Sequence, residues 1–149
     1  MKNNKLYINI QIVKKSDFNF LYELLEERDY RDNISHKKMP AFNQHVNFVL
    51  SKPYSKWYII FNDDKKIGSI YITKQNEIGL HFRNSEWKEK FVEMAIRLLI
   101  EKNQKEKYLI NINPKNKKML NFFKNKGFQL IQYTYELDFK NIRPGSRKL

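Results

Sequence analysis

The stretch from Glu77 to Ile100 constrains the fold most, because it joins a strand-like segment directly to an amphipathic helix. Residues 77–82 (EIGLHF) have the composition of a strand, and the polar residues 83–85 follow. The next segment has apolar side chains at the i, i+3, i+4, i+7 and i+8 spacing of one helical face: Phe91, Met94, Ala95, Leu98 and Leu99. A helix that starts at the carboxyl end of a strand presents unpaired amide groups there, and these attract an anion such as phosphate. We therefore expect a strand–helix unit with an anion site at its turn.

Before this unit the sequence predicts a strand, two helices and two more strands. Residues 6–13 alternate as a strand does, and Ser16 and Asp17 supply an N-cap for a helix that continues to Arg28. The polar residues 29–41 predict a loop. A short helix follows over 43–50, with Val46 and Val49 facing inward. Strands over 57–61 and 66–73, each followed by a short turn, predict an antiparallel meander with 77–82.

After the unit the pattern predicts a strand over 108–112, a helix that Pro114 and Asn116 open and Gly127 closes, and a last strand over 128–139. The order β-α-α-β-β-β-α-β-α-β indicates an α/β protein with a mixed sheet, in which 77–82 and 108–112 run parallel. We expect one domain over residues 1–139. The basic residues 140–149 lack periodicity and are expected to fray.

Composition excludes several kinds of site. The 149 residues contain no cysteine, which rules out disulfides, thiolate zinc sites and cysteine nucleophiles. The histidines and carboxylates do not have metal-ligand spacing, so no metal is expected. No apolar run is long enough to span a bilayer and no signal peptide is recognisable, so we expect a cytoplasmic protein without a membrane partner.

The formal charge of +13 is compatible with an anionic partner such as nucleic acid. The positive side chains are spread along the chain rather than gathered in one stripe. The abundance of Lys, Asn and Ile is also what an AT-rich genome would produce. We therefore favour a compositional bias and keep nucleic-acid binding as an alternative.

Three segments together resemble the GNAT superfamily of N-acetyltransferases. Residues 67–82 (IGSIYITKQNEIGLHF) resemble the family's β3–β4 hairpin, and residues 113–128 (NPKNKKMLNFFKNKGF) resemble its β5–α4 signature. Residues 36–60 (HKKMPAFNQHVNFVLSKPYSKWYII) are similar to members that acylate amino sugars or other small amines. The resemblance covers nearly the whole chain.

The resemblance implies a sheet that splays between its fourth and fifth strands, with acetyl-CoA in the gap. Pantetheine would pair with the backbone around Leu80, Phe82 and Arg83. Asn116 would contact it as well, in addition to capping a helix.

The family's pyrophosphate loop is glycine-rich, but here bulkier residues stand in its place: Trp87, Lys88, Lys90 and Val92. Any Cβ obstructs a phosphate that approaches backbone amides, so an ordinary helix starting near Ser85 is expected instead. Lys88 and Lys90 could hold the pyrophosphate by charge, or could simply form a solvated helical face. If the site is closed, the domain does not use CoA.

The chemistry requires a base for the ammonium proton. Glu77 resembles the glutamate that acts as the base in many family members, usually through a water molecule. Alternatively, Glu77 only forms a salt bridge in the lysine-rich hairpin. His81, on the same strand face about 13 Å away, is the second catalytic candidate or a structural histidine. Phe123 stands where many members have a proton-donating tyrosine. Tyr133 or Tyr135 could replace it, or could belong to the core.

The acceptor side would be lined by four residues: His36, His45, Tyr54 and Trp57. The leading hypothesis is therefore transfer of an acetyl or similar acyl group from acyl-CoA to a small-molecule amine, such as an amino sugar, by direct attack. The alternatives are a GNAT-shaped binding module that has lost CoA and a nucleic-acid-binding domain. A homodimer is left open.

Overall fold

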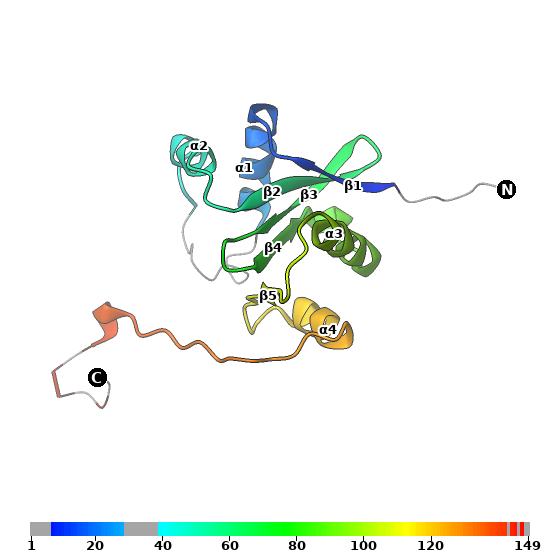
Figure 1. The fold of residues 1–149 in the computed structure, drawn as a ribbon. Coiled ribbons are helices and arrows are strands. Elements are labelled where there is room, and N and C mark those ends of the chain that lie inside the picture. The colour runs from blue at the N-terminus through cyan, green and yellow to red at the C-terminus, as the bar shows by residue number, and fades with distance from the viewer. Residues whose placement is uncertain (1–6, 29–38, 143, 146, 148–149) are drawn as a thin grey trace.

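The computed structural model describes residues 7–28, 39–142, 144–145 and 147, and its centre is a five-stranded sheet (Figure 1). The strands lie in chain order and are β1 (Ile8–Ile12), β2 (Lys56–Asn62), β3 (Lys65–Ile72), β4 (Glu77–Phe82) and β5 (Leu109–Ile110). The first three pairings are antiparallel, whereas β4 and β5 are parallel. The predicted mixed sheet and its parallel β-α-β unit are confirmed.

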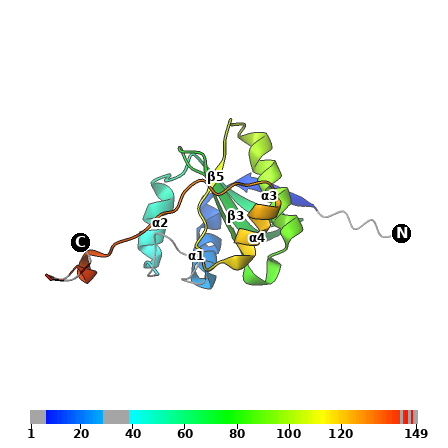
Figure 2. The ribbon, with the colours of Figure 1, turned by 90° about the horizontal axis from the view of Figure 1, so that it is seen from below.

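Helices cover both faces of this sheet (Figure 2). One face carries α1 (Phe18–Glu27) and α2 (Phe42–Leu50), and the other carries α3 (Glu89–Lys102) and α4 (Lys117–Asn125). Short 3-10 turns occupy Lys15–Asp17, Asn84–Glu86 and Phe139–Asn141. None of the helices in the described ranges is long and apolar enough to cross a bilayer.

The larger core lies between the sheet and α3 with α4. From α3 it buries Phe91, Val92, Ala95, Ile96 and Leu99. Met94 and Leu98, which we also expected on this face, are only partly buried. The apolar stripe of α3 is wider than five residues, so the tertiary contacts of α3 with β1 and β3 decide which part is deepest.

The smaller core lies under α1 and α2, and its buried residues are Phe20, Leu21, Leu24, Val49 and Ile59. On α2 the second buried side chain is His45, whereas Val46 is only partly covered. Val49 is thus buried, whereas Val46, also expected to face inward, lies at the margin of this core. A polar residue in an apolar layer is costly unless it is hydrogen-bonded or serves a ligand.

The strand predicted over 128–139 does not form. Beyond α4 this segment runs outside the body of the fold and pairs with no strand among the described residues (Figure 1). Its alternating sequence suits a strand, but a ladder forms only where a second backbone supplies donors and acceptors. The boundary at residue 139 stays a prediction.

Candidate active site

The fourth and fifth strands separate shortly after they meet. Register pairs Glu77 with Leu109 and Ile78 with Ile110, and the pairing ends there, although β4 continues to Phe82. On its other side β4 pairs with β3 along Ile78–Phe82. The sheet is therefore open beside the second half of β4, as the resemblance implied.

The backbone of β4 presents hydrogen-bonding groups to this gap. Arg83 N–H donates to the Ile67 carbonyl and Thr73 N–H donates to the Glu77 carbonyl, so odd-numbered residues of β4 face β3. In an antiparallel ladder the even-numbered residues then face the opposite way. The amide and carbonyl groups of Leu80 and Phe82 thus point into the gap, where no described strand pairs with them.

A pocket of about 230 Å³ lies on the α1 and α2 face of the sheet. Four predicted site residues line it: His45, Tyr54, Trp57 and His81. The remaining lining residues are Leu21, Leu24, Leu25, Arg28, Pro40, Gln44, Phe48, Ser69 and Tyr71. Residues predicted from separate parts of the sequence are therefore brought together. His36 lies outside the described residues.

Aromatic rings form one wall of the pocket. The Tyr54 and Tyr71 rings stack with centroids 3.6 Å apart, and the Trp57 ring stands edge-on to Tyr54 at 4.8 Å. Trp57 Nε1 donates to Ser69 Oγ at 2.7 Å, which fixes the indole. Burial, followed by the neighbouring Tyr71, raises the pKa of Tyr54, so its hydroxyl stays protonated at neutral pH.

Sequence reasoning missed Ser69 and Tyr71 as site residues. They alternate on β3, and the register places them opposite His81 and Gly79. The alternation of β3 could have indicated that they share a face. Only the pairing with β4 shows that this face is the one that carries His81.

Both pocket histidines are held neutral. Burial, and next the positive charge of Arg28, lower the pKa of His81 to about 3. Burial also lowers the pKa of His45, which is only 5% exposed. The Nε2 atom of His45 is buried and has no hydrogen-bond partner among the described residues, so a polar atom of a residue that lines the pocket is left unsatisfied.

Glu77 lies at the paired end of β4 rather than in the pocket. Asn111, just beyond β5, donates from Nδ2 to its carboxylate. Glu77 and His81 share a strand face with Gly79 between them, and a Cβ at Gly79 would lie 1.8 Å from the Tyr71 ring. The Tyr71 ring therefore covers β4 between the two catalytic candidates.

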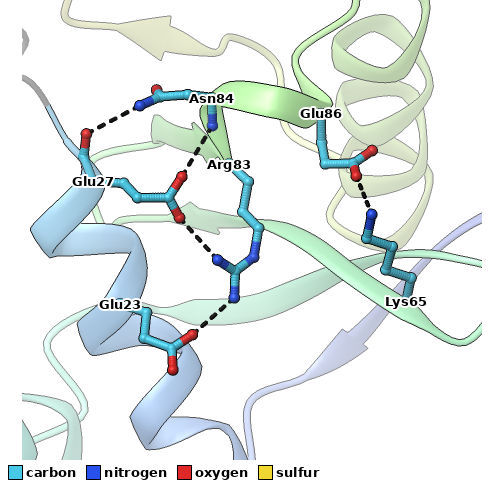
Figure 3. A network of polar contacts seen from close by, with 6 residues as sticks. All are labelled: Glu23, Glu27, Lys65, Arg83, Asn84 and Glu86. Atoms are coloured by element: carbon cyan, nitrogen blue, oxygen red, sulfur yellow. Dashed lines mark hydrogen bonds and ion pairs between the residues drawn. The ribbon is translucent and has the colours of Figure 1, made fainter.

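The end of β4 is tied to α1 by a polar network (Figure 3). Arg83 donates to Glu27 at 2.9 Å and to Glu23 at 2.8 Å, and its guanidinium lies 4.9 Å from the Phe20 ring centroid. Asn84 adds hydrogen bonds from its backbone and side chain to Glu27. The Arg83 side chain is thus directed to α1, and its backbone N–H, predicted as part of the pantetheine contact, donates to the Ile67 carbonyl of β3 instead.

The start of α3 differs from the expected helix at Ser85. A 3-10 turn covers Asn84–Glu86, and α3 begins only at Glu89 because Lys88 has extended backbone torsions (φ −141°, ψ 139°). The Lys88 side chain does not cap the helix, and Lys88 and Lys90 are both exposed. The Trp87 ring packs against the larger core with Lys118 Nζ 3.7 Å from its centroid.

Asn116 caps α4, since its Oδ1 accepts from Met119 N–H at 3.2 Å. Phe123, which we expected in place of a proton donor, is 3% exposed within the larger core. Within the described residues no group of three or more histidines, aspartates or glutamates could hold a metal ion.

No protein-family model and no curated protein matches this sequence. Solved structures do match. A domain from Methanocaldococcus jannaschii DSM 2661 is 18% identical and superposes with a TM-score of 0.71 over 89% of this chain and 94% of its own. An acetyltransferase from Thermus thermophilus is 14% identical, with a TM-score of 0.68 over 85% and 90% of the two chains.

A third match is RimL, a ribosomal L7/L12 alpha-N-protein acetyltransferase whose structure holds coenzyme A. It is 14% identical, with a TM-score of 0.66 over 84% of this chain and 81% of its own. The chain has the GNAT fold. At these identities the likeness concerns the fold alone, and the predicted resemblance is confirmed at that level. The splayed β4 and β5 of this GNAT fold are its candidate cofactor site.

Proposed function

We propose that this chain is an N-acyltransferase that moves an acetyl or similar acyl group from acyl-CoA to the amine of a small molecule by direct attack. One observation carries the proposal: the unpaired half of β4 opens beside a pocket lined with aromatic and histidine side chains. A donor held along the strand and an acceptor held in the pocket would meet at β4.

The residues of the gap fit the donor. Leu80 and Phe82 offer free backbone groups to the amides of pantetheine, and Lys88 and Lys90 offer charge to its phosphates. Asn116 uses Oδ1 as a helix cap, which leaves its amide nitrogen for pantetheine. Arg83 would act indirectly by fixing the end of β4. Acyl-CoA supplies the activated thioester.

The pocket supports a small ring-bearing acceptor, and an amino sugar is one such molecule. Aromatic faces bind rings by stacking, while His45 Nε2 and Ser69 offer hydrogen bonds. The described lining residues include no carboxylate that would select a polycation. Amino sugars are therefore expected to be better acceptors than polyamines.

We assign proton acceptance to Glu77 and positioning of the amine to His81. As the amine nitrogen bonds to the acyl carbon, the carbon–sulfur bond breaks and the nitrogen must lose a proton. An imidazole with a pKa of about 3 holds a proton poorly at neutral pH, whereas a carboxylate can accept one through water. Because Glu77 and His81 are about 13 Å apart and Tyr71 covers Gly79 between them, the proton must pass along a chain of waters to the side of that ring.

Calorimetric titration with acetyl-CoA, followed by a thiol-release assay over a panel of amines, tests the proposal. The chain has no cysteine, so released CoA is the only thiol present. Glu77→Gln should lower kcat about 100-fold with little change in KM. His81→Gln should mainly raise KM. Glu101→Gln, on the exposed surface of α3, is the matched control and should change neither.

The main alternative is a GNAT-shaped binding module without acyl transfer. The helix start without glycines and the buried Phe123 favour it. Failure to bind acetyl-CoA at millimolar concentration would remove the enzyme and leave this module. Nucleic-acid binding through the basic surface, the third hypothesis, predicts affinity for a DNA or RNA duplex that falls steeply as the salt concentration rises. A gel shift that does not change as protein is added would remove this hypothesis.

A further inference from the structure

The segment 128–139 exposes several large apolar side chains next to one another along the chain. The side chains at the odd-numbered positions 131–139 are all apolar or aromatic. Their exposed fractions are 72% at Ile131, 77% at Tyr133, 91% at Tyr135, 48% at Leu137 and 84% at Phe139. The alternate positions 132, 134, 136 and 138 are polar. Period-two alternation of this kind is the pattern of a strand with one buried face.

The segment lies extended outside the fold, on the side where β5 forms the edge of the sheet (Figures 1 and 2). Gly127, with φ +88°, ends α4 and starts this departure. β5 itself has only two ladder residues, and its outer side pairs with no strand in the described part of the chain. Each copy thus has one strand-like segment and one sheet edge that form a ladder with no strand in the described ranges.

We propose that residues 128–139 of one copy add as a strand to the outer edge of β5 of a second copy, and that the exchange is reciprocal in a two-fold dimer. Because each copy both gives a strand and receives one, the assembly closes at two chains. The added strand would lengthen β5 and brace the outer side of the β4–β5 gap. This inference does not depend on the proposed acyl transfer.

Charge supports a second copy as the occupant. Residues 128–139 contain Glu136 and Asp138 and no basic residue, in a chain of net charge +13. The residues around β5, 102–118, contain six lysines and one glutamate. The acidic strand and the basic edge therefore attract each other, whereas most other surfaces of two such cationic chains repel.

The exposed side-chain area of this segment is also large enough for a specific dimer interface. Tyr133, Tyr135 and Phe139 alone expose roughly 500 Å² of side chain. Two exchanged segments would bury about twice that amount before the aliphatic side chains and the backbone ladder are added. This exceeds the roughly 1,000 Å² expected of a specific interface.

The first test measures molecular mass by light scattering during gel filtration. The full chain should elute as a dimer. Tyr133→Asp with Tyr135→Asp should raise the dimer Kd about 100-fold or more, because two central aromatic contacts are lost. Gln132→Asp with Thr134→Asp places the same charge on the opposite face and should leave the dimer intact. A monomeric wild type, or equal effects of the two pairs, would overturn the proposal.

The second test identifies the receiving edge, using the absence of native cysteines. One chain carrying Leu109→Cys and a differently tagged chain carrying Tyr135→Cys are co-expressed and treated with a flexible bis-maleimide. A covalent heterodimer is expected, while Gln11→Cys on β1 with Tyr135→Cys should give none. In a single chain with both Leu109→Cys and Tyr135→Cys, cross-linking confined within the monomer would show that the segment returns to its own β5, which contradicts strand exchange.

Discussion

Gly79 lies beneath the ring of Tyr71, and this contact shapes the pocket wall. A Cβ at position 79 would lie 1.8 Å from that ring, so no side chain fits without moving Tyr71. Because Tyr71 stacks on Tyr54, the displacement would pass to the aromatic wall. The glycine is therefore required by packing rather than by its backbone torsions.

Gly79→Ala should lower the free energy of unfolding by about 1–3 kcal/mol, as expected for overpacking, and should also weaken acceptor binding. Urea unfolding and acceptor KM measure the two effects. Gly127→Asn is the control, since nothing lies within 4 Å of that position and asparagine tolerates its positive φ. A loss at Gly127 as large as at Gly79 would contradict the packing argument.

The two neutral histidines make stability depend on pH. Their pKa values in the folded chain lie below the ordinary value of 6.5, with His81 at about 3. Below pH 6.5 the unfolded chain therefore binds protons that the folded chain refuses, so stability falls as pH falls. For His81 the slope should approach about 1.4 kcal/mol per pH unit between pH 6.5 and its pKa of about 3, and His45 adds to the loss in the same direction.

Urea unfolding at pH 7.5, 6 and 5 measures this loss before most carboxylates titrate. The double variant His45→Gln with His81→Gln should flatten the dependence over the same range. A wild type equally stable at pH 7.5 and pH 5 would show that the histidines ionise freely in the fold.

The structure locates most of the predicted site residues, whereas the roles given to them stay predictions. His45, Tyr54, Trp57 and His81 were proposed from different stretches, and the structure places them in one pocket. Tyr71 and Ser69 were missed because their membership depends on the register between β3 and β4. That register is a long-range property that alternation within one strand does not determine.

At the scale of elements, Arg83 and Asn84 attach α1 to the end of β4 (Figure 3). Leu21, Leu24, Leu25 and Arg28 of α1 and its C-cap line the pocket, so this attachment also positions one of its walls. A contact between two elements thereby connects stability with ligand binding.

Arg83→Gln should cost about 1 kcal/mol, because the paired carboxylates are partly exposed, and should also raise acceptor KM several-fold. Arg97→Gln, which removes an exposed pair to Glu93 within α3, is the control and should leave KM unchanged. An Arg83 variant that loses stability but binds acceptor normally would show that α1 holds its place without this network.

Periodicity predicted the core elements because their burial is regular: β4 was predicted over its observed residues, and α1 and α2 within two. Periodicity gave wrong predictions where a strand needs a second strand to pair with, and where the backbone before a helix is extended. The start of α3 moved from Ser85 to Glu89 because Trp87 and Lys88 are extended. The strand predicted over 128–139 was wrong for the single chain, because alternation within one segment does not supply the second backbone that a ladder needs.

At the scale of the whole molecule, the order of the strands has a consequence for how the chain folds. Two residues join β2 to β3 and four join β3 to β4, whereas residues 83–108 separate β4 from β5. Short closures cost little chain entropy, so the meander should assemble early, and the parallel ladder that borders the gap should assemble late.

Native-state hydrogen exchange can detect this hierarchy. The Leu109 amide, which donates to Asn76, should exchange through local opening well before the Ile70 amide in the middle of the sheet. Equal protection at both amides would indicate a single cooperative unit. If the hierarchy holds, the β4–β5 gap is the last part of the molecule to form. A ligand that binds both of its sides would then stabilise the folded state at its weakest boundary.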